Sequence, residues 1–167
     1  PETQGGLVKT LDFKIYLGLL SETYNEAHAR DLERVKGVAI DMVVVNLYPF
    51  KETVAREDVT VEFARTNIDI GGPCMVRAAA KNFPFVTVIC DPIDYPGLLE
   101  QVKANAGGTT YEFRKNCAKR AYAHTADYDM AVAAYFERVM SAGVSEENRF
   151  PATLSLNYVR AASLRYG

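Results

Sequence analysis

The stretch IDIGGPCMVRAAAKN holds residue types that could bind a small anionic molecule. Asp69 stands just before the pair Gly71 and Gly72, and a helix-forming run with two cations follows. A ligand can approach a glycine backbone closely, and the amides at a helix N-terminus favour negative charge. The stretch therefore predicts either a binding site or a plain turn that Asp69 caps.

The two cations of this run, Arg77 and Lys81, are four residues apart and share one helix face. Like charges at that spacing cost about 0.2–0.5 kcal/mol in an isolated helix. A bound anion, a facing carboxylate or plain solvation would offset this cost. The spacing alone leaves these three explanations open.

Two further segments offer polar groups of the same kind. GGLVKT, residues 5–10, places Lys9 beside a glycine turn, where a lysine can hold a phosphate or carbonyl oxygen as a point charge. NLYPF, residues 46–50, places Asn46 and Tyr48 after a predicted strand, where α/β sheets present site residues. A simple turn and a core tyrosine are the competing explanations.

Two reactive side chains are given structural roles. His124, in AYAHTADYD, lies at a predicted helix break, and we expect it to satisfy that break rather than to act as a general base. Cys74 follows Pro73 at a helix start, which can lower a thiol pKa. Because no histidine is near it in sequence, Cys74 is not proposed as a nucleophile.

The elements that would position these residues alternate between strand and helix. The short apolar runs 40–46 and 85–90 predict buried parallel strands, closed by Pro49 and by Asp91-Pro92. Helices are predicted over 61–66, 73–82, 94–105 and from Thr109 or Thr110 onward, the last with a break near His124-Thr125. This order indicates an α/β domain. Since two strands make a very small sheet, we expect further strands before Pro1 or in segments without a clear pattern.

Composition narrows the function classes. The 167 residues suit one domain, and 19 Lys and Arg against 21 Asp and Glu argue against a nucleic-acid partner. The longest apolar runs are too short to span a bilayer, and no secretory signal is visible. Three widely spaced cysteines predict reduced thiols, and two histidines predict no metal site. We expect a cytoplasmic protein without a membrane partner.

Four strings, GGLVKTL, DMVVVNLYPF, NIDIGGPCMVRAAAKN and AHTADYD, together resemble the inosine monophosphate (IMP) cyclohydrolase domain of the bifunctional purine-biosynthesis enzyme. The resemblance implies a methylglyoxal-synthase-like α/β fold with a parallel central sheet flanked by helices. It implies a cyclohydrolase-like domain over 1–140. Residues 141–167 would form a linker and, at LRYG, the start of a transformylase-like segment.

The resemblance also implies a reaction. The carboxamide nitrogen of 5-formamidoimidazole-4-carboxamide ribotide attacks its own formyl carbon, the ring closes to IMP, and water leaves. No cofactor is implied. The implied partners are this purine nucleotide, a second copy of the chain in a homodimer, and a transformylase that this chain lacks and another chain could supply.

The family's functional residues carry over to matching positions of this sequence. The resemblance implies Lys81 as a proton-transfer or oxyanion-stabilising residue, Asp69 as the holder of the reacting end of the base, and Lys9 and Tyr48 as site-lining catalytic residues. Substrate contacts would extend to Val8, Thr10, Val45, Asn46, Ile70, Gly71 and Gly72.

Three departures from the family pattern keep other readings open. Leu7 replaces an arginine that could contact phosphate, Asp12 and Phe13 replace His-Pro, and the phosphate-binding segments are expected before Pro1. Leu7 and Asp12 favour a non-catalytic relative that binds a nucleotide or a protein partner. Methylglyoxal synthase chemistry on the same fold is a third reading, which the complete IDIGG…RAAAKN and NLYPF set disfavours.

Overall fold

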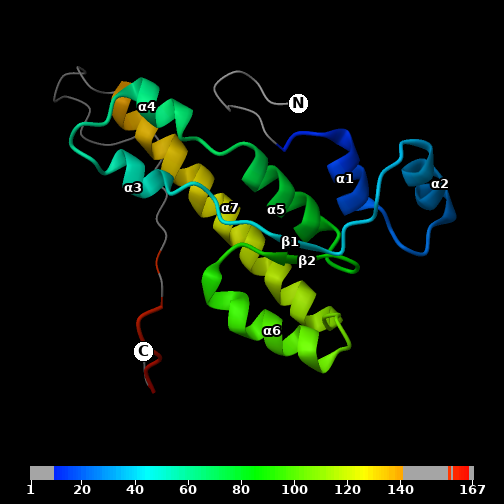
Figure 1. Cartoon of the computed structure of the whole chain (residues 1–167). Helices are drawn as coiled ribbons and strands as arrows, with labels where there is room; N and C mark the ends of the chain where they lie inside the picture. Colours follow the sequence, from blue (N-terminus) through cyan, green and yellow to red (C-terminus); the bar gives the residue numbers. More distant parts are fainter. Residues whose placement is uncertain (1–9, 141–157, 159, 166–167) are drawn as a thin grey trace.

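A computed structural model describes residues 10–140, 158 and 160–165. Its centre is a parallel pair of strands, β1 (Met42–Val44) and β2 (Thr87–Ile89), with Val43 opposite Val88. Helices surround the pair (Figure 1), so the predicted α/β class is confirmed. The helices are α1 (Phe13–Leu20), α2 (Glu26–Arg34), α3 (Phe50–Val54), α4 (Val61–Thr66), α5 (Gly71–Lys81), α6 (Tyr95–Ala104) and α7 (Tyr111–Met140), with a 3-10 turn, η1 (Pro92–Asp94), before α6.

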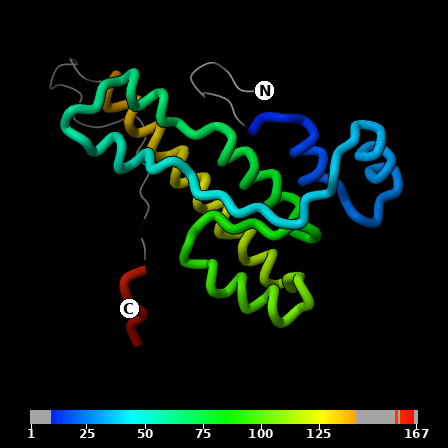
Figure 2. The backbone as a smooth tube through the Cα atoms, viewed as in Figure 1, coloured from blue at the N-terminus to red at the C-terminus, as the bar shows by residue number. Residues whose placement is uncertain are grey.

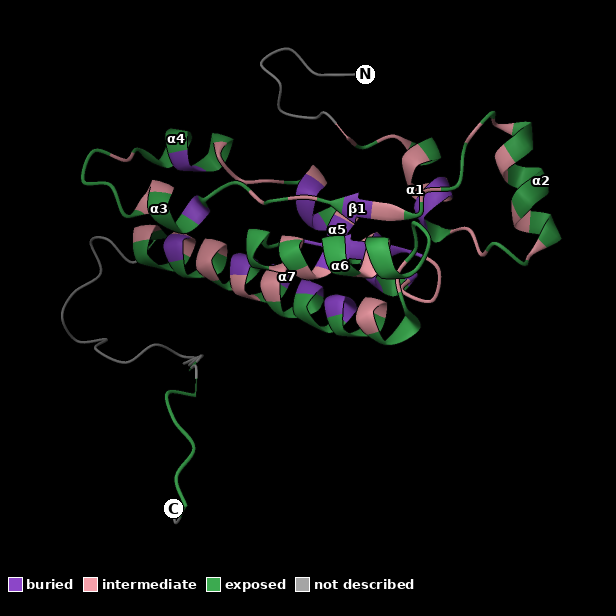
Figure 3. Cartoon of the chain, turned by 60° about the horizontal axis from the view of Figure 1, so that its bottom comes forward, coloured by how far each residue is buried: buried purple, intermediate pink, exposed green. Residues whose placement is uncertain are grey.

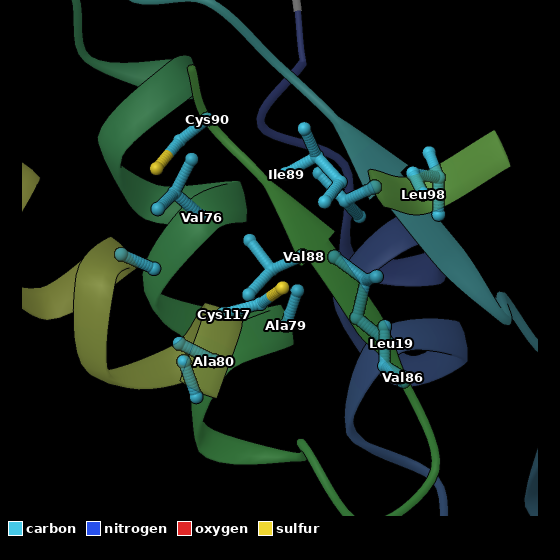
Figure 4. Close-up of a cluster of buried hydrophobic side chains, with 13 residues drawn as sticks. Leu19, Val76, Ala79, Ala80, Val86, Val88, Ile89, Cys90, Leu98 and Cys117 are labelled. Atoms are coloured by element: carbon cyan, nitrogen blue, oxygen red, sulfur yellow. The ribbon is translucent and has the colours of Figure 1, made fainter. Parts of the chain in front are cut away.

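The main core lies where helices cover β2. Both α5 and α7 pack against this strand, and α1 packs against α5. All three residues of β2 are buried, as expected of a strand that is covered on both faces. Figure 4 shows Val76 and Ala79 of α5 next to Val88 and Cys117, which belongs to α7.

A second, aromatic core joins α3 and α4 to the far part of α7. The Phe50 ring lies 6.1 Å from the Tyr128 ring and 5.8 Å from the Tyr135 ring, and Ala64 is buried with them. The 30 residues of α7 make a helix about 45 Å long, which reaches both cores. Figure 3 shows the buried positions recurring along this helix. Because α7 contacts both cores, it fixes the loops that follow β1 and β2 relative to the sheet.

The second helix, α2, stands at one end of the molecule (Figure 2) and has no buried residue. Its first turn is capped by Asn25, whose side-chain oxygen accepts from the amides of Ala27 and His28. No described helix is long and apolar enough to cross a membrane.

The predicted elements are present with shifted ends. Both strands are shorter than their apolar runs, and the helix over 61–66 is confirmed. The predicted helix start at Pro73 is two residues late, because the Asp69 carboxylate already accepts from the Gly72 amide at 2.8 Å. The prediction missed α1, α2 and α3, which are short or lack an apolar run of their own.

The predicted break near His124-Thr125 is wrong. The α7 helix continues through both residues, and Thr125 is fully buried within it. Its hydroxyl donates to the carbonyls of Ala121 and Tyr122, each at 3.2 Å, so the side chain is satisfied inside the helix. His124 therefore has no break to cap.

The boundary predicted at residue 141 stays a prediction. The last described helix ends at Met140, and of the predicted linker and transformylase start, 141–167, residues 141–157, 159 and 166–167 lie outside the described residues. The same holds for all of the GGLVKT segment except Thr10.

The core makes a stability prediction with a matched control. Ile89 is 1% exposed at the end of β2, whereas Ile93 in η1 is 78% exposed. Ile89→Ala should lower the free energy of unfolding by about 2–5 kcal/mol, because it leaves a cavity. Ile93→Ala should change it by less than about 0.5 kcal/mol. Urea denaturation measures both, and equal effects of the two changes would contradict this core.

Candidate functional site

The loops that follow β1 and precede α5 meet at Asp69. One carboxylate oxygen of Asp69 accepts from the Gly72 amide at 2.8 Å, and the other accepts from the Tyr48 amide at 3.3 Å. The backbone amide of Asp69 donates to the Tyr128 hydroxyl at 2.8 Å. Asp69 thus ties together the β1 loop, the start of α5 and the middle of α7.

Gly71 and Gly72, at the start of α5, are required because neighbouring atoms lie too close to leave room for a side chain. A Cβ at Gly72 would lie 2.5 Å from Asp69 Oδ2 and 2.8 Å from Leu47 Cδ2. A Cβ at Gly71 would collide with the hydroxyl of Thr10. The glycines therefore let the Asp69 cap form and bring Thr10 to the N-terminus of α5.

Asn46 is held at the other side of the β1 loop. Its side-chain nitrogen donates to the Tyr95 hydroxyl at 3.0 Å, where α6 begins. The preceding residue, Val45, continues the sheet, since its amide donates to the Ile89 carbonyl at 2.9 Å. Asn46 and Tyr48 therefore leave the sheet on a loop that both α5 and α6 fix.

A cavity of about 550 Å³ opens beside this loop. It is lined by residues that follow β1 and β2 and by one face of α7, including Asn46, Tyr48, Cys90, His124, Asp127 and Tyr128. A neighbouring cavity of about 310 Å³ shares Cys90, Asp91, His124 and Asp127 with it. Both lie at the carboxyl ends of the parallel strands, where α/β sheets bind small molecules.

The charged residues of the larger cavity are mainly acidic. The lining contains three carboxylates, those of Asp91, Asp127 and Glu52, and one lysine, Lys51. Lys51 Nζ lies 2.6 Å from Asp127 Oδ2, an exposed pair that adds at most about 1 kcal/mol to stability. This lining suits a neutral polar group that donates hydrogen bonds better than it suits a phosphate.

Burial sets the protonation of two cavity groups. Burial, followed by the nearby Asp94 carboxylate, raises the pKa of the Cys90 thiol to about 11. Burial also raises the pKa of the Tyr128 hydroxyl. Both groups are therefore protonated at neutral pH, and the Tyr128 hydroxyl keeps a proton to donate. Among the described residues, no group of three or more His, Cys, Asp or Glu is arranged to hold a metal ion.

The structure brings together only part of the predicted site. Asp69 and Tyr48 meet as described, with Gly71, Gly72 and Thr10 beside them, whereas Asn46 is held by Tyr95 at the other side of the β1 loop. Ile70 is 49% exposed before α5. Lys81 is exposed at the opposite end of α5, about 15 Å from its first residue. Lys9 and Val8 lie outside the described residues.

Sequence reasoning gave Tyr128, Asp127 and Cys90 no site role and assigned His124 to a helix break. The usable signal was the i, i+4 spacing of His124 and Tyr128, which places both on one face of an unbroken helix. The predicted break hid this spacing. The two readings of Asp69 are not exclusive, because its carboxylate caps α5 and also lies near the cavity loop.

A cavity with polar side chains at the carboxyl ends of parallel strands is typical of α/β domains that bind small molecules. The family model of the AICARFT/IMPCHase bienzyme matches residues 79–167. The chain therefore belongs to the AICARFT/IMPCHase bienzyme family, as the resemblance in sequence implied.

Individual relatives agree with this family. The chain is 46% identical over 167 residues to the bifunctional purine biosynthesis protein PurH of Acidithiobacillus ferrooxidans, and 45% identical over 168 residues to that of a Thermoanaerobacter species. These matches cover 100% of this chain but only 32% of the length of each relative. The crystal structure of ForH matches with a TM-score of 0.71 and 32% identity, over 82% of this chain and 70% of that one.

The cysteines give a chemical test of the cavity wall. All three are free, as predicted; Cys74 is exposed, whereas Cys90 and Cys117 are buried. Because burial raises the pKa of both buried thiols, they hold little of the reactive thiolate at pH 8. Iodoacetamide at pH 8 should therefore label Cys74 at least tenfold faster than the other two, as measured by peptide mass spectrometry. Equal labelling rates in folded protein would contradict the buried position of Cys90.

Proposed function

We propose that this chain carries the IMP cyclohydrolase site of its family. The substrate would be 5-formamidoimidazole-4-carboxamide ribotide and the product IMP, with loss of water. The observation that carries the proposal is the junction of Tyr48 and Asp69 beside a cavity at the strand ends. Family membership in purine biosynthesis supports the same substrate class.

The proposed reaction asks little of the protein. Both reacting groups sit on one imidazole ring, so their proximity is built into the substrate. The protein has to turn the formyl group toward the amide, stabilise the oxyanion that develops on the formyl oxygen, and move protons. A site of fixed polar side chains is sufficient for these tasks.

Asp69, Tyr48 and Asn46 suit the first two tasks. The Asp69 carboxylate is oriented by two backbone amides and retains lone pairs that can accept from the substrate carboxamide. Asn46 offers its amide oxygen to a ligand in the cavity, because its nitrogen is engaged with Tyr95. The Tyr48 side chain is 47% exposed, so its hydroxyl is accessible to a ligand.

The remaining parts of the proposal rest on resemblance. Lys9, with Val8 and Thr10, would hold the nucleotide, and Lys81 would take part in proton transfer. The methylglyoxal-synthase-like fold, the homodimer, the cytoplasmic location and a transformylase supplied elsewhere in the protein or by a separate chain are proposed on the same ground. So is the division into a cyclohydrolase-like part, 1–140, and a linker with transformylase start, 141–167.

The second candidate is a non-catalytic nucleotide-binding relative, favoured by Leu7 and Asp12. Asp12 has a local role, however: its side chain accepts from the Lys14 amide at 2.8 Å and caps α1. Its charge is thereby explained by helix capping, which weakens the case for lost catalysis. Leu7 lies outside the described residues.

The first test uses the full-length protein and Asp69. Wild-type protein should convert the formylated ribotide to IMP, followed by ultraviolet absorbance. Asp69→Ala should lower turnover by a factor on the order of 10² and weaken IMP binding, since the carboxylate no longer holds the base. Asp12→Ala, which removes a cap away from the cavity, is the control. A folded wild-type protein that binds IMP without turnover would support the non-catalytic relative instead.

Lys81 needs its own test, because it stands apart from Asp69 in the described structure. Lys81→Ala should also lower turnover by a factor on the order of 10² if this lysine moves the proton. Lys103→Ala, a change in the last turn of α6, serves as a matched control. Turnover equal to that of the control would remove Lys81 from the mechanism and leave the Asp69 site in place.

A further inference from the structure

We propose that His124 is a catalytic residue of this site. Its imidazole takes the proton from the carboxamide nitrogen as the ring closes and returns it to the formyl oxygen, which then leaves as water. The inference rests on the proposed cyclohydrolase function and adds a residue that the resemblance did not assign.

The position of His124 links it to the Asp69 junction. His124 and Tyr128 are one turn apart on α7 and line the same cavity of about 550 Å³. The Tyr128 hydroxyl accepts from the Asp69 amide, so this face of α7 is fixed to the loop that carries Asp69. Asn46 and Tyr48 line the same cavity from the β1 loop, whereas His124 lines it from α7.

The ring nitrogens of His124 are also not engaged by other described residues. The ring makes no hydrogen bond or ion pair with any residue in the described part of the chain, and it is half-buried. The other histidine, His28, is used structurally: its ring accepts from the Glu22 amide at 3.1 Å and lies 3.3 Å from the Asn25 side chain. Because α7 is unbroken, His124 has no comparable structural role.

The neighbouring acids are less available than His124. Asp127 is paired with Lys51 at 2.6 Å, and one oxygen of Asp91 accepts from the Ile93 amide at 2.9 Å. The negative charge of Asp127 and Asp91 disfavours a nucleotide phosphate in this cavity. It favours the carboxamide and formamido groups, whose N–H groups can donate hydrogen bonds to the carboxylates. The reacting end of the base is therefore the part of the substrate that meets His124.

The proton balance of the step is complete without a further reactant. Neutral His124 accepts one proton from the carboxamide nitrogen while the C–N bond to the formyl carbon forms. The resulting imidazolium donates that proton to the oxyanion on the same carbon, which becomes a hydroxyl. His124 then carries the proton of the formamido N–H to this hydroxyl, the C–O bond breaks to release water, and the C=N double bond of the product forms. The lone pair on the ring nitrogen is restored, so His124 ends the cycle neutral.

The test compares variants of the two histidines in the full-length protein. His124→Ala and His124→Asn should each lower kcat by a factor on the order of 10² with KM changed less than about threefold. His28→Ala, the matched control on α2, should keep wild-type kcat. Free imidazole should restore part of the kcat of His124→Ala, because it can enter the vacated space and carry the proton. Thermal unfolding and IMP binding are measured for each variant, and His124→Asn keeps a polar side chain if the alanine variant does not fold.

The outcomes separate this inference from the function on which it rests. Loss of kcat with imidazole rescue supports His124 as the proton carrier. Wild-type kcat in a folded His124→Asn protein overturns the inference and leaves the cyclohydrolase intact. A parallel loss of kcat and stability without rescue also overturns it, because His124 would then be structural. Wild-type protein that binds IMP without turning over the ribotide overturns the proposed function itself.

Discussion

The capping of α5 by the Asp69 carboxylate is the interaction on which the site depends. A cap of this kind contributes about 0.5–2 kcal/mol. Its greater effect is geometric, because the other oxygen of the same carboxylate accepts from the Tyr48 amide and the Asp69 backbone donates to Tyr128. Gly72 makes the cap possible, since a side chain there would occupy the space of Asp69 and Leu47. One residue thus sets the relative position of the β1 loop, α5 and α7.

The length of α7 turns this local junction into a rigid frame. Near its start the helix packs on β2 through Cys117 and Ala121, and farther along it packs on Phe50 through Tyr128 and Tyr135. A kink between these two contact regions would move the wall of the cavity relative to the strand ends. The buried hydroxyl of Thr125 is satisfied by carbonyls within the helix, so the helix continues through this stretch without an outside partner for Thr125.

The sequence predicted the parts of the fold that depend on local patterns. Buried apolar runs identify strands, and the alanine-rich run after Gly72 identifies a helix, because these signals lie within a few residues. The start of α5 was misplaced because its cap, Asp69, lies before two glycines that read as a turn. His124 was assigned to a helix break, because the residues that line the cavity with it, Asn46 and Tyr48, lie far away in the chain. Long-range contacts of this kind leave no local pattern.

The charges around the site divide it into two regions with different chemistry. The cavity side carries Asp91 and Asp127 with Lys51 as its cation, so it favours uncharged groups that donate hydrogen bonds. The side of Thr10 and Gly71 borders the α5 N-terminus, where the helix dipole favours negative charge. A nucleotide has one end of each kind. Under the proposed function, a nucleotide lying across the Asp69 junction would present its base to the cavity and its phosphate toward Thr10 and Gly71, and the reverse orientation would set the phosphate against Asp91 and Asp127.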